Sequence, residues 1–178
     1  GHEKYLKTTV FGITGLFVDY GIIVIGANTG ITRLTKEHLG ILLYMNIPTI
    51  VVITKIDVAP DQVYKRTKMK LKRLLSRTEF GKKLLFISNE FEEAKDEVSQ
   101  YLEKLTNNET LIPVISISNK TGHNIENLHS IINNLKPRQQ WDKDKIDGSL
   151  FFIDSTFKVQ GIGLILSGIL KGEDITLN

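Results

Sequence analysis

Cysteine is absent from the 178-residue chain. This absence excludes disulfide bonds, thiolate metal sites and a cysteine nucleophile, and it fits a reducing compartment. The chain also lacks any apolar run near the ~20 residues that a membrane-spanning helix needs, and no signal-peptide pattern opens it. The formal net charge is only +3, so the total charge barely constrains the partner. We therefore expect a cytoplasmic protein without a membrane partner.

Short apolar runs alternate along the chain with stretches whose apolar residues recur at helical spacing. The runs predict buried strands at residues 22–25, 49–53, 84–87 and 112–117. The helical patterns cover residues 35–43, 60–75, 91–105 and 125–135, and a further helix closes near Gly15. Thr35 is the expected N-cap of the second helix. Alternating strands and helices predict an α/β fold, with a parallel sheet and helices on both of its faces.

The composition changes at Pro137. Residues 137–148 are polar and charged and end in a glycine, which predicts a linker. Short strands follow at residues 150–153, 156–159 and 164–170, and turn residues between them indicate antiparallel pairing. Three short strands do not make a barrel alone, so we expect a second domain that begins at 149–178 and continues further. Residues 1–136 would form the first domain.

The motif TKID, residues 54–57, follows the apolar run 49–53. Alternate residues at a strand end face the same way, so Lys55 and Asp57 can address one ligand. A carboxylate accepts through two oxygens, which match the ring N–H and exocyclic amine of guanine, and a lysine stem can cover a ring face. For so short a motif, the alternative is a surface salt bridge between the two side chains.

A second motif, SNKTG at residues 118–122, follows the run 112–117. The backbone N–H groups of Ser118, Asn119 and Lys120 can donate to a carbonyl such as guanine O6. The alternative is an ordinary turn into a helix that Asn124 caps. Because ligands bind beyond the carboxyl ends of parallel strands, both motifs are expected at one edge of the sheet.

The order of several longer segments is more specific than either short motif. In chain order they are GHEKYLKTTVFGITG, GANTGI, TKEHLG, NIPTIVVITKID and ISNKTG. Together they resemble the GTPase domain of translational GTPases of the elongation factor Tu class, and most of all the GTP-binding protein 1 and 2 subfamily. The later segment FKVQGIGLILSGILKGE resembles the start of the family's β-barrel second domain. The resemblance covers nearly the whole chain and implies a P-loop-NTPase-like sheet.

The resemblance also implies roles for individual residues. Gly1 would donate its backbone N–H to the terminal phosphate of GTP, and His2 would orient the attacking water. Both match the end of the family's Asp-x-x-Gly-His signature, although a Gly-His pair can also remain from a tag. Thr54 replaces the asparagine that is commoner in the family, so one contact to the base would be weaker. The implied nucleotide-binding residues are Gly1, Thr54, Lys55, Asp57, Ser118, Asn119 and Lys120.

Other parts of the family's site have no counterpart in the sequence. The phosphate-binding loop, the threonine that senses the terminal phosphate and the Mg²⁺ ligands would all lie upstream of Gly1. We therefore expect a fragment of a longer GTPase that is inactive by itself. The resemblance implies GTP or GDP with Mg²⁺ as ligands and the ribosome and transfer RNA as partners, and it gives no reason to expect DNA.

A run of basic residues lies on and just after the stretch 60–75 of the third predicted helix. Its members are Lys65, Arg66, Lys68, Lys70, Lys72, Arg73 and Arg77, with no acid between them. This face can contact RNA phosphates, or it can simply be solvated. A second class of function therefore stays open, a nucleotide-dependent RNA-binding or scaffolding module whose hydrolysis is slow or lost. The histidines at 38, 123 and 129 have no metal-ligand spacing.

Overall fold

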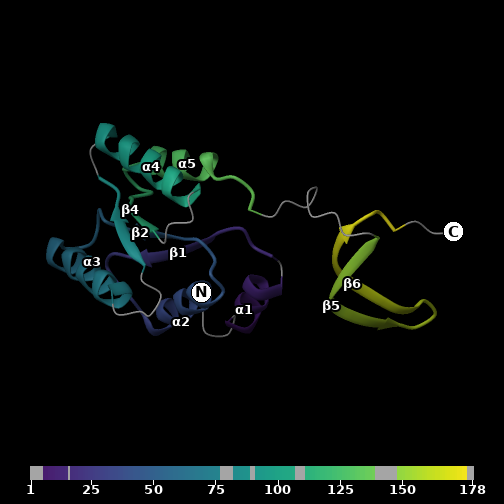
Figure 1. Ribbon diagram of the computed structural model, residues 1–178. Helices are drawn as coiled ribbons and strands as arrows, with labels where there is room; N and C mark the ends of the chain where they lie inside the picture. Colours follow the sequence, from purple (N-terminus) through teal and green to yellow (C-terminus); the bar gives the residue numbers. More distant parts are fainter. Residues whose placement is uncertain are drawn as a thin grey trace.

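The computed structural model describes residues 6–15, 17–76, 82–88, 91–106, 111–138 and 148–175, without the side chains of 91–93, 105 and 106. A four-stranded parallel sheet has the order β1-β2-β4-β3, and a separate two-stranded sheet pairs β5 with β6 (Figure 1). The parallel strands are β1 (Gly21–Gly26), β2 (Thr49–Thr54), β3 (Lys83–Phe86) and β4 (Leu111–Ser116). The helices are α1 (Leu6–Gly15), α2 (Arg33–Tyr44), α3 (Asp61–Ser76), α4 (Phe91–Thr106) and α5 (Ile125–Asn134).

Helices cover both faces of the parallel sheet (Figure 1). Alternate residues of β2 enter two different cores: Val51 and Ile53 belong to the cluster on the α2 and α3 side, and Ile50 and Val52 to the cluster on the α4 and α5 side. All four side chains are buried, because a strand with helices on both faces leaves neither side to water. The predicted α/β fold is confirmed.

The edge strand β1 differs from the prediction of a buried strand. Ile23 and Ile25 are buried, but Ile22 is 46% exposed and Val24 is 62% exposed. The strand is last in the order of the sheet, and only its α2 side is covered within the described residues. A run of β-branched residues predicts a strand, but it does not reveal how many of the strand's faces are covered.

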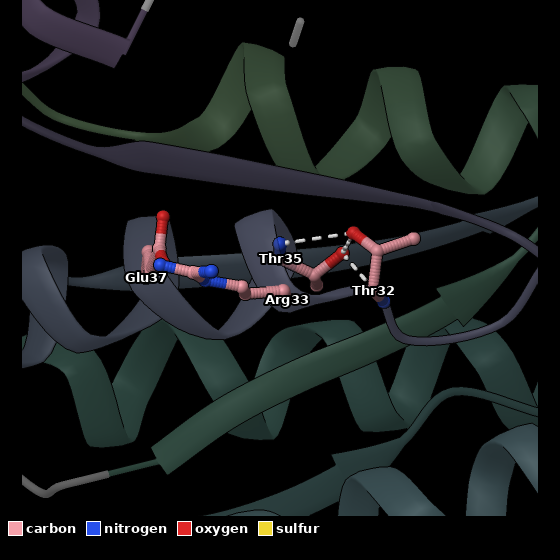
Figure 2. Close-up of polar contacts among 4 residues, drawn as sticks. All are labelled: Thr32, Arg33, Thr35 and Glu37. Atoms are coloured by element: carbon pink, nitrogen blue, oxygen red, sulfur yellow. Dashed lines mark hydrogen bonds and ion pairs between the residues drawn. The ribbon is translucent and has the colours of Figure 1, made fainter. Parts of the chain in front are cut away.

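The N-terminus of α2 begins at a different cap from the predicted one. Thr32 is the N-cap, and its hydroxyl accepts a hydrogen bond from the backbone N–H of Thr35 at 3.2 Å. The Thr35 hydroxyl in turn accepts from the Thr32 backbone N–H at 3.2 Å, which completes a reciprocal capping box (Figure 2). From the first residue of the helix, Arg33 pairs with Glu37 at 2.8 Å. Thr35 therefore supports the cap from the third helical position, where the sequence suggested the cap itself.

The second sheet is a hairpin of β5 (Ser149–Val159) and β6 (Gly163–Gly172), and its antiparallel pairing was predicted. Two of the predicted short strands, at 150–153 and 156–159, form one strand whose register shifts between Ile153 and Ser155. A bulge of this kind bends a strand without ending it, so the polar residues there were mistaken for a turn. None of the described helices is both long and apolar enough to cross a membrane.

The chain that leaves α5 returns to the segment before β1. The Tyr20 hydroxyl donates to the carbonyl of Lys136 at 2.8 Å, and the backbone N–H of Arg138 donates to Asp19 Oδ1 at 2.8 Å. In the same segment, the ring of Phe17 meets that of Phe152 in the hairpin edge-on, with 5.0 Å between centroids. These contacts lie on either side of residues 139–147, which fall outside the description.

Candidate functional site

The two predicted loops follow neighbouring parallel strands. β2 pairs with β4 in a register that sets Ile53 opposite Ser116, and the backbone N–H of Ile117 donates to the carbonyl of Ile53 at 2.8 Å. Both strands therefore end at the same edge, and residues 54–57 and 118–122 leave the sheet side by side. In open α/β sheets, this carboxyl edge is where ligands bind.

A direct hydrogen bond joins the two loops. The Ser118 hydroxyl donates to Asp57 Oδ1 at 2.7 Å and accepts from the backbone N–H of Thr121 at 3.2 Å. Ser118 is fully buried, whereas Asp57 is exposed. Since a carboxylate offers about four lone-pair positions, this single bond orients Asp57 and leaves most of its acceptor capacity free.

Lys55 and Asp57 do not form the surface salt bridge that was the alternative interpretation of TKID. Within the described residues, the hydrogen-bond partner of the Asp57 side chain is Ser118, and no carboxylate pairs with the Lys55 ammonium. The two side chains are both exposed at the end of β2. A single charge of each sign thus remains open to a ligand at this edge.

The prediction that strand alternation turns Lys55 and Asp57 the same way was wrong. Both residues still belong to the loop that follows β2. β2 ends at Thr54, and Lys55 has a φ of 60°, so the alternation of a strand does not continue. A turn follows, in which the N–H of Val58 donates to the carbonyl of Lys55 at 3.3 Å. A left-handed lysine costs roughly 1–2 kcal/mol, and such strained residues cluster at functional sites.

The three backbone amides of the SNK loop differ in whether they already donate a hydrogen bond within the chain. The N–H of Ser118 donates to the carbonyl of His123 at 3.2 Å. Contrary to the prediction, this amide is therefore not available to guanine. Asn119 and Lys120 are exposed residues, and their backbone N–H groups make no hydrogen bond with any part of the chain that the structure describes. Two adjacent backbone donors therefore have no partner among the described residues, and they directly follow Ser118, which binds Asp57.

Asn124 supports this loop in a way that the sequence did not suggest. It occupies the N-cap position of α5 with a φ of 60°, but its side chain caps nothing. Instead its Nδ2 donates to the carbonyl of Ser116 at 3.1 Å and to that of Ser88 at 3.4 Å, and its Oδ1 accepts from Asn127 at 2.8 Å. The side chain thus links the carboxyl ends of β3 and β4 to α5.

A hydrogen bond between side chains joins α3 to β4, one of the two central strands. The Tyr64 hydroxyl donates to Ser116 Oγ at 2.7 Å. The two residues are 52 positions apart, so no local pattern could pair them. Asn124 and Tyr64 together hold Ser116 from its carbonyl and its side chain, two residues before Ser118.

Of the remaining predicted site residues, the structure describes Thr54 but not Gly1 or His2. Thr54 closes β2, and its carbonyl accepts from the N–H of Ala27 at 2.8 Å. Gly1 and His2 lie outside the described residues. No group of three or more His, Cys, Asp or Glu side chains that could hold a metal ion occurs among the residues that are described.

Residues 1–138 match the family model described as the elongation factor Tu GTP binding domain. The chain is 39% identical to GTP-binding protein 1 of Xenopus laevis over 178 residues, a match that covers 100% of this chain and 26% of that protein. It is 31% identical over 174 residues to the selenocysteine-specific elongation factor of Methanocaldococcus jannaschii, which covers 97% of this chain and 31% of that protein.

A solved structure gives the same result. Translation elongation factor SelB from Methanococcus maripaludis, in complex with the GTP analogue GPPNHP, aligns with a TM-score of 0.55 at 27% identity, over 97% of this chain and 32% of that one. The chain therefore spans between about a quarter and a third of the length of these relatives. The resemblance inferred from the sequence is confirmed: this chain belongs to the family of elongation factor Tu GTP-binding domains.

Proposed function

We propose that this chain binds guanine through its TKID and SNK loops, and that the protein containing it hydrolyses GTP to GDP and phosphate. The 2.7 Å hydrogen bond between Ser118 Oγ and Asp57 Oδ1 carries the proposal. It joins an exposed carboxylate to a loop with two free backbone amides, which are the donors and acceptors that a guanine edge requires.

In the proposed complex, Asp57 accepts from the ring N–H and the exocyclic amine of guanine. The amides of Asn119 and Lys120 donate to guanine O6, and the aliphatic stem of Lys55 covers the ring face. Adenine presents neither this pair of donors nor the carbonyl, so the same loops reject it. Thr54 has a hydroxyl where the family more often has an amide, and this weakens one contact to the base.

Hydrolysis requires residues that the structure does not describe. Gly1 would donate its backbone N–H to the terminal phosphate, and His2 would orient the water that attacks it. Mg²⁺ bound together with the nucleotide would supply positive charge against the phosphates. Residues 1–15 would form a segment that the terminal phosphate orders and hydrolysis releases.

The names of two relatives suggest where such a GTPase acts. One is a selenocysteine-specific elongation factor, and the other is translation elongation factor SelB, solved with a GTP analogue. By analogy, we propose the ribosome and transfer RNA as cytoplasmic partners of the whole protein. We also propose that residues 1–136 belong to the GTPase domain, 137–148 to a linker and 149–178 to the start of a β-barrel domain.

The test is the Asp57→Asn variant of the full-length protein. An asparagine amide donates to the carbonyl that xanthine carries in place of guanine's amine, while its oxygen still accepts from the ring N–H. We expect GTP affinity to fall by a factor of about 10⁴ and xanthosine triphosphate to become the preferred ligand, because unmatched polar groups are strongly discriminated. Fluorescence titration with labelled forms of both nucleotides measures this exchange of preference.

The matched control is Asp61→Asn, which removes the same charge from an exposed position in the first turn of α3. It should leave both affinities unchanged. If Asp57→Asn binds GTP as tightly as the natural protein, Asp57 does not recognise the base and the proposal fails.

A further inference from the structure

A hollow of about 330 Å³ lies between α2 and α3. Its apolar lining comes from Ile31, just before α2, and from Leu74 on α3. Its charged lining comes from Lys36 on α2 and from Lys70 and Arg73 on α3. The volume is at the lower end of the range of small-molecule pockets, about 300–1,000 Å³. Two helices thus present three positive charges around one partly apolar hollow.

Among the described residues, the three cations of this hollow have no acidic partner. Within the described residues the ion pair at this end of α2 joins Arg33 to Glu37, and no carboxylate pairs with Lys36, Lys70 or Arg73. Like charges that gather without counter-charges repel one another and destabilise the folded state. A bound anion would relieve that repulsion, so the arrangement favours an anionic ligand.

The positive charge continues along α3 beyond the hollow. Lys65, Arg66 and Lys72 are exposed, and the helix's acidic residue, Asp61, lies in its first turn. From Lys65 to Arg73 the cations extend over about 12 Å of helix axis at 1.5 Å per residue. A solvated face ordinarily mixes both signs of charge, so this extended row favours a ligand with repeated negative charges.

Lys68 belongs to the same run of sequence but has another environment. Its ammonium lies 5.3 Å from the centre of the Tyr64 ring and 4.8 Å from that of Phe86. A lysine over two aromatic faces is held by the protein itself. The row available to a ligand therefore consists of the remaining cations of α3 together with Lys36.

We propose that this surface binds the phosphate backbone of single-stranded RNA. Lys36, Lys70 and Arg73 contact phosphates, and the apolar lining from Ile31 and Leu74 accommodates a ribose or base between them. Phosphate contacts of this kind are independent of sequence and weaken with salt. The surface shares no residue with the proposed guanine site, so the two proposals can fail separately.

The experiment uses the full-length protein and a fluorescein-labelled polyuridylate 20-mer, with anisotropy titrations at several salt concentrations. Each phosphate contact contributes about 0.7 to the slope of log affinity against log salt for a single strand. The double variant Lys70→Gln/Arg73→Gln should therefore reduce the slope by about 1.4. Lys36→Gln, on the other helix, should reduce it by about half as much.

The matched control is Lys104→Gln/Lys158→Gln, which removes two charges from α4 and from the hairpin and should leave the slope unchanged. Affinity for GDP, measured on the same samples, should stay constant in every variant. An unchanged slope in both test variants overturns the proposal. Tighter binding of a polyglutamate 20-mer than of the RNA also overturns it, because the surface would then suit an acidic protein.

Discussion

The parallel sheet and the hairpin contain similar residues in different surroundings. Both are rich in Ile, Leu and Val, but β2 is buried along nearly its whole length, whereas the hairpin is largely exposed within the described residues. Its exposed apolar side chains are Leu150, Phe152, Ile153, Phe157, Val159, Leu164, Ile165 and Leu166. Strand-forming residues therefore predict pairing, while helices packed on the sheet create the core.

The parallel sheet and the hairpin also differ in the kind of hydrogen bonds that they contain. In the parallel sheet, the side chains of Tyr64 and Asn124 bond to Ser116 at the carboxyl end of β4, and Ser118 bonds to Asp57 after β2. The hairpin's long-range bonds are mainly those of its own backbone ladder. Polar side chains that are partly buried under loops are costly unless paired. They gather at the edge of the sheet where we propose the guanine site.

The largest expected effect compares one leucine from each region. Leu71 on α3 is fully buried, and Leu164 on β6 is 67% exposed. Leu71→Ala should lower the free energy of unfolding by about 2–5 kcal/mol, because it opens a cavity in the core. Leu164→Ala should lower it by no more than about 0.5 kcal/mol. Urea denaturation followed by circular dichroism measures both changes. Equal losses would show that the hairpin's apolar face is covered in the full-length protein.

A smaller effect is expected from a comparison of one serine from each region, Ser118 and Ser167. Ser118→Ala removes the hydroxyl that orients Asp57 and leaves the N–H of Thr121 without its acceptor. We expect GDP affinity to fall about tenfold, the equivalent of one hydrogen bond to a charged group. Ser167→Ala, at an exposed position of β6, is the control. Isothermal titration calorimetry would contradict the proposed site if the two variants bound GDP equally well.

The smallest effect concerns Tyr101, which is buried on α4 with a hydroxyl that lacks a hydrogen-bond partner among the described residues. Burial, and then the charge of Tyr20, raises the pKa of Tyr101 above its ordinary value of 10.0. Its folded-state pKa is raised, so its contribution to stability is complete below pH 10 and is lost as the pH rises further. Tyr101→Phe should therefore weaken the loss of stability above pH 10 and, at neutral pH, raise stability by up to about 1 kcal/mol.

The control for that prediction is Tyr44→Phe, because Tyr44 is 80% exposed. Burial also raises the pKa of Tyr20, so part of the alkaline loss should remain in the Tyr101 variant. Unfolding curves in urea at pH 8 and above pH 10 compare the three proteins. Identical pH dependence in natural protein and Tyr101→Phe would mean that Tyr101 reaches water in the folded state.

Most of the fold could be predicted from local patterns. The strands that begin near Thr49 and Leu111 and the helix that begins at Asp61 were expected within one or two residues, since apolar periodicity and turn residues determine them locally. The half-exposed edge strand and the single bulged strand of the hairpin were not expected. Both depend on what packs or pairs alongside, which a local pattern does not contain.

Local patterns in the sequence are enough to give the order of the elements, the family and the polar residues at the strand ends. Three contacts depend on the packing of the whole domain: Ser118 bonds to Asp57, Asn124 joins two strand ends, and Lys36 joins the cations of α3 around one hollow. The cause is distance along the chain. Helical and strand periods act over a few residues, whereas these contacts join residues that only a parallel sheet with helices on its faces brings together.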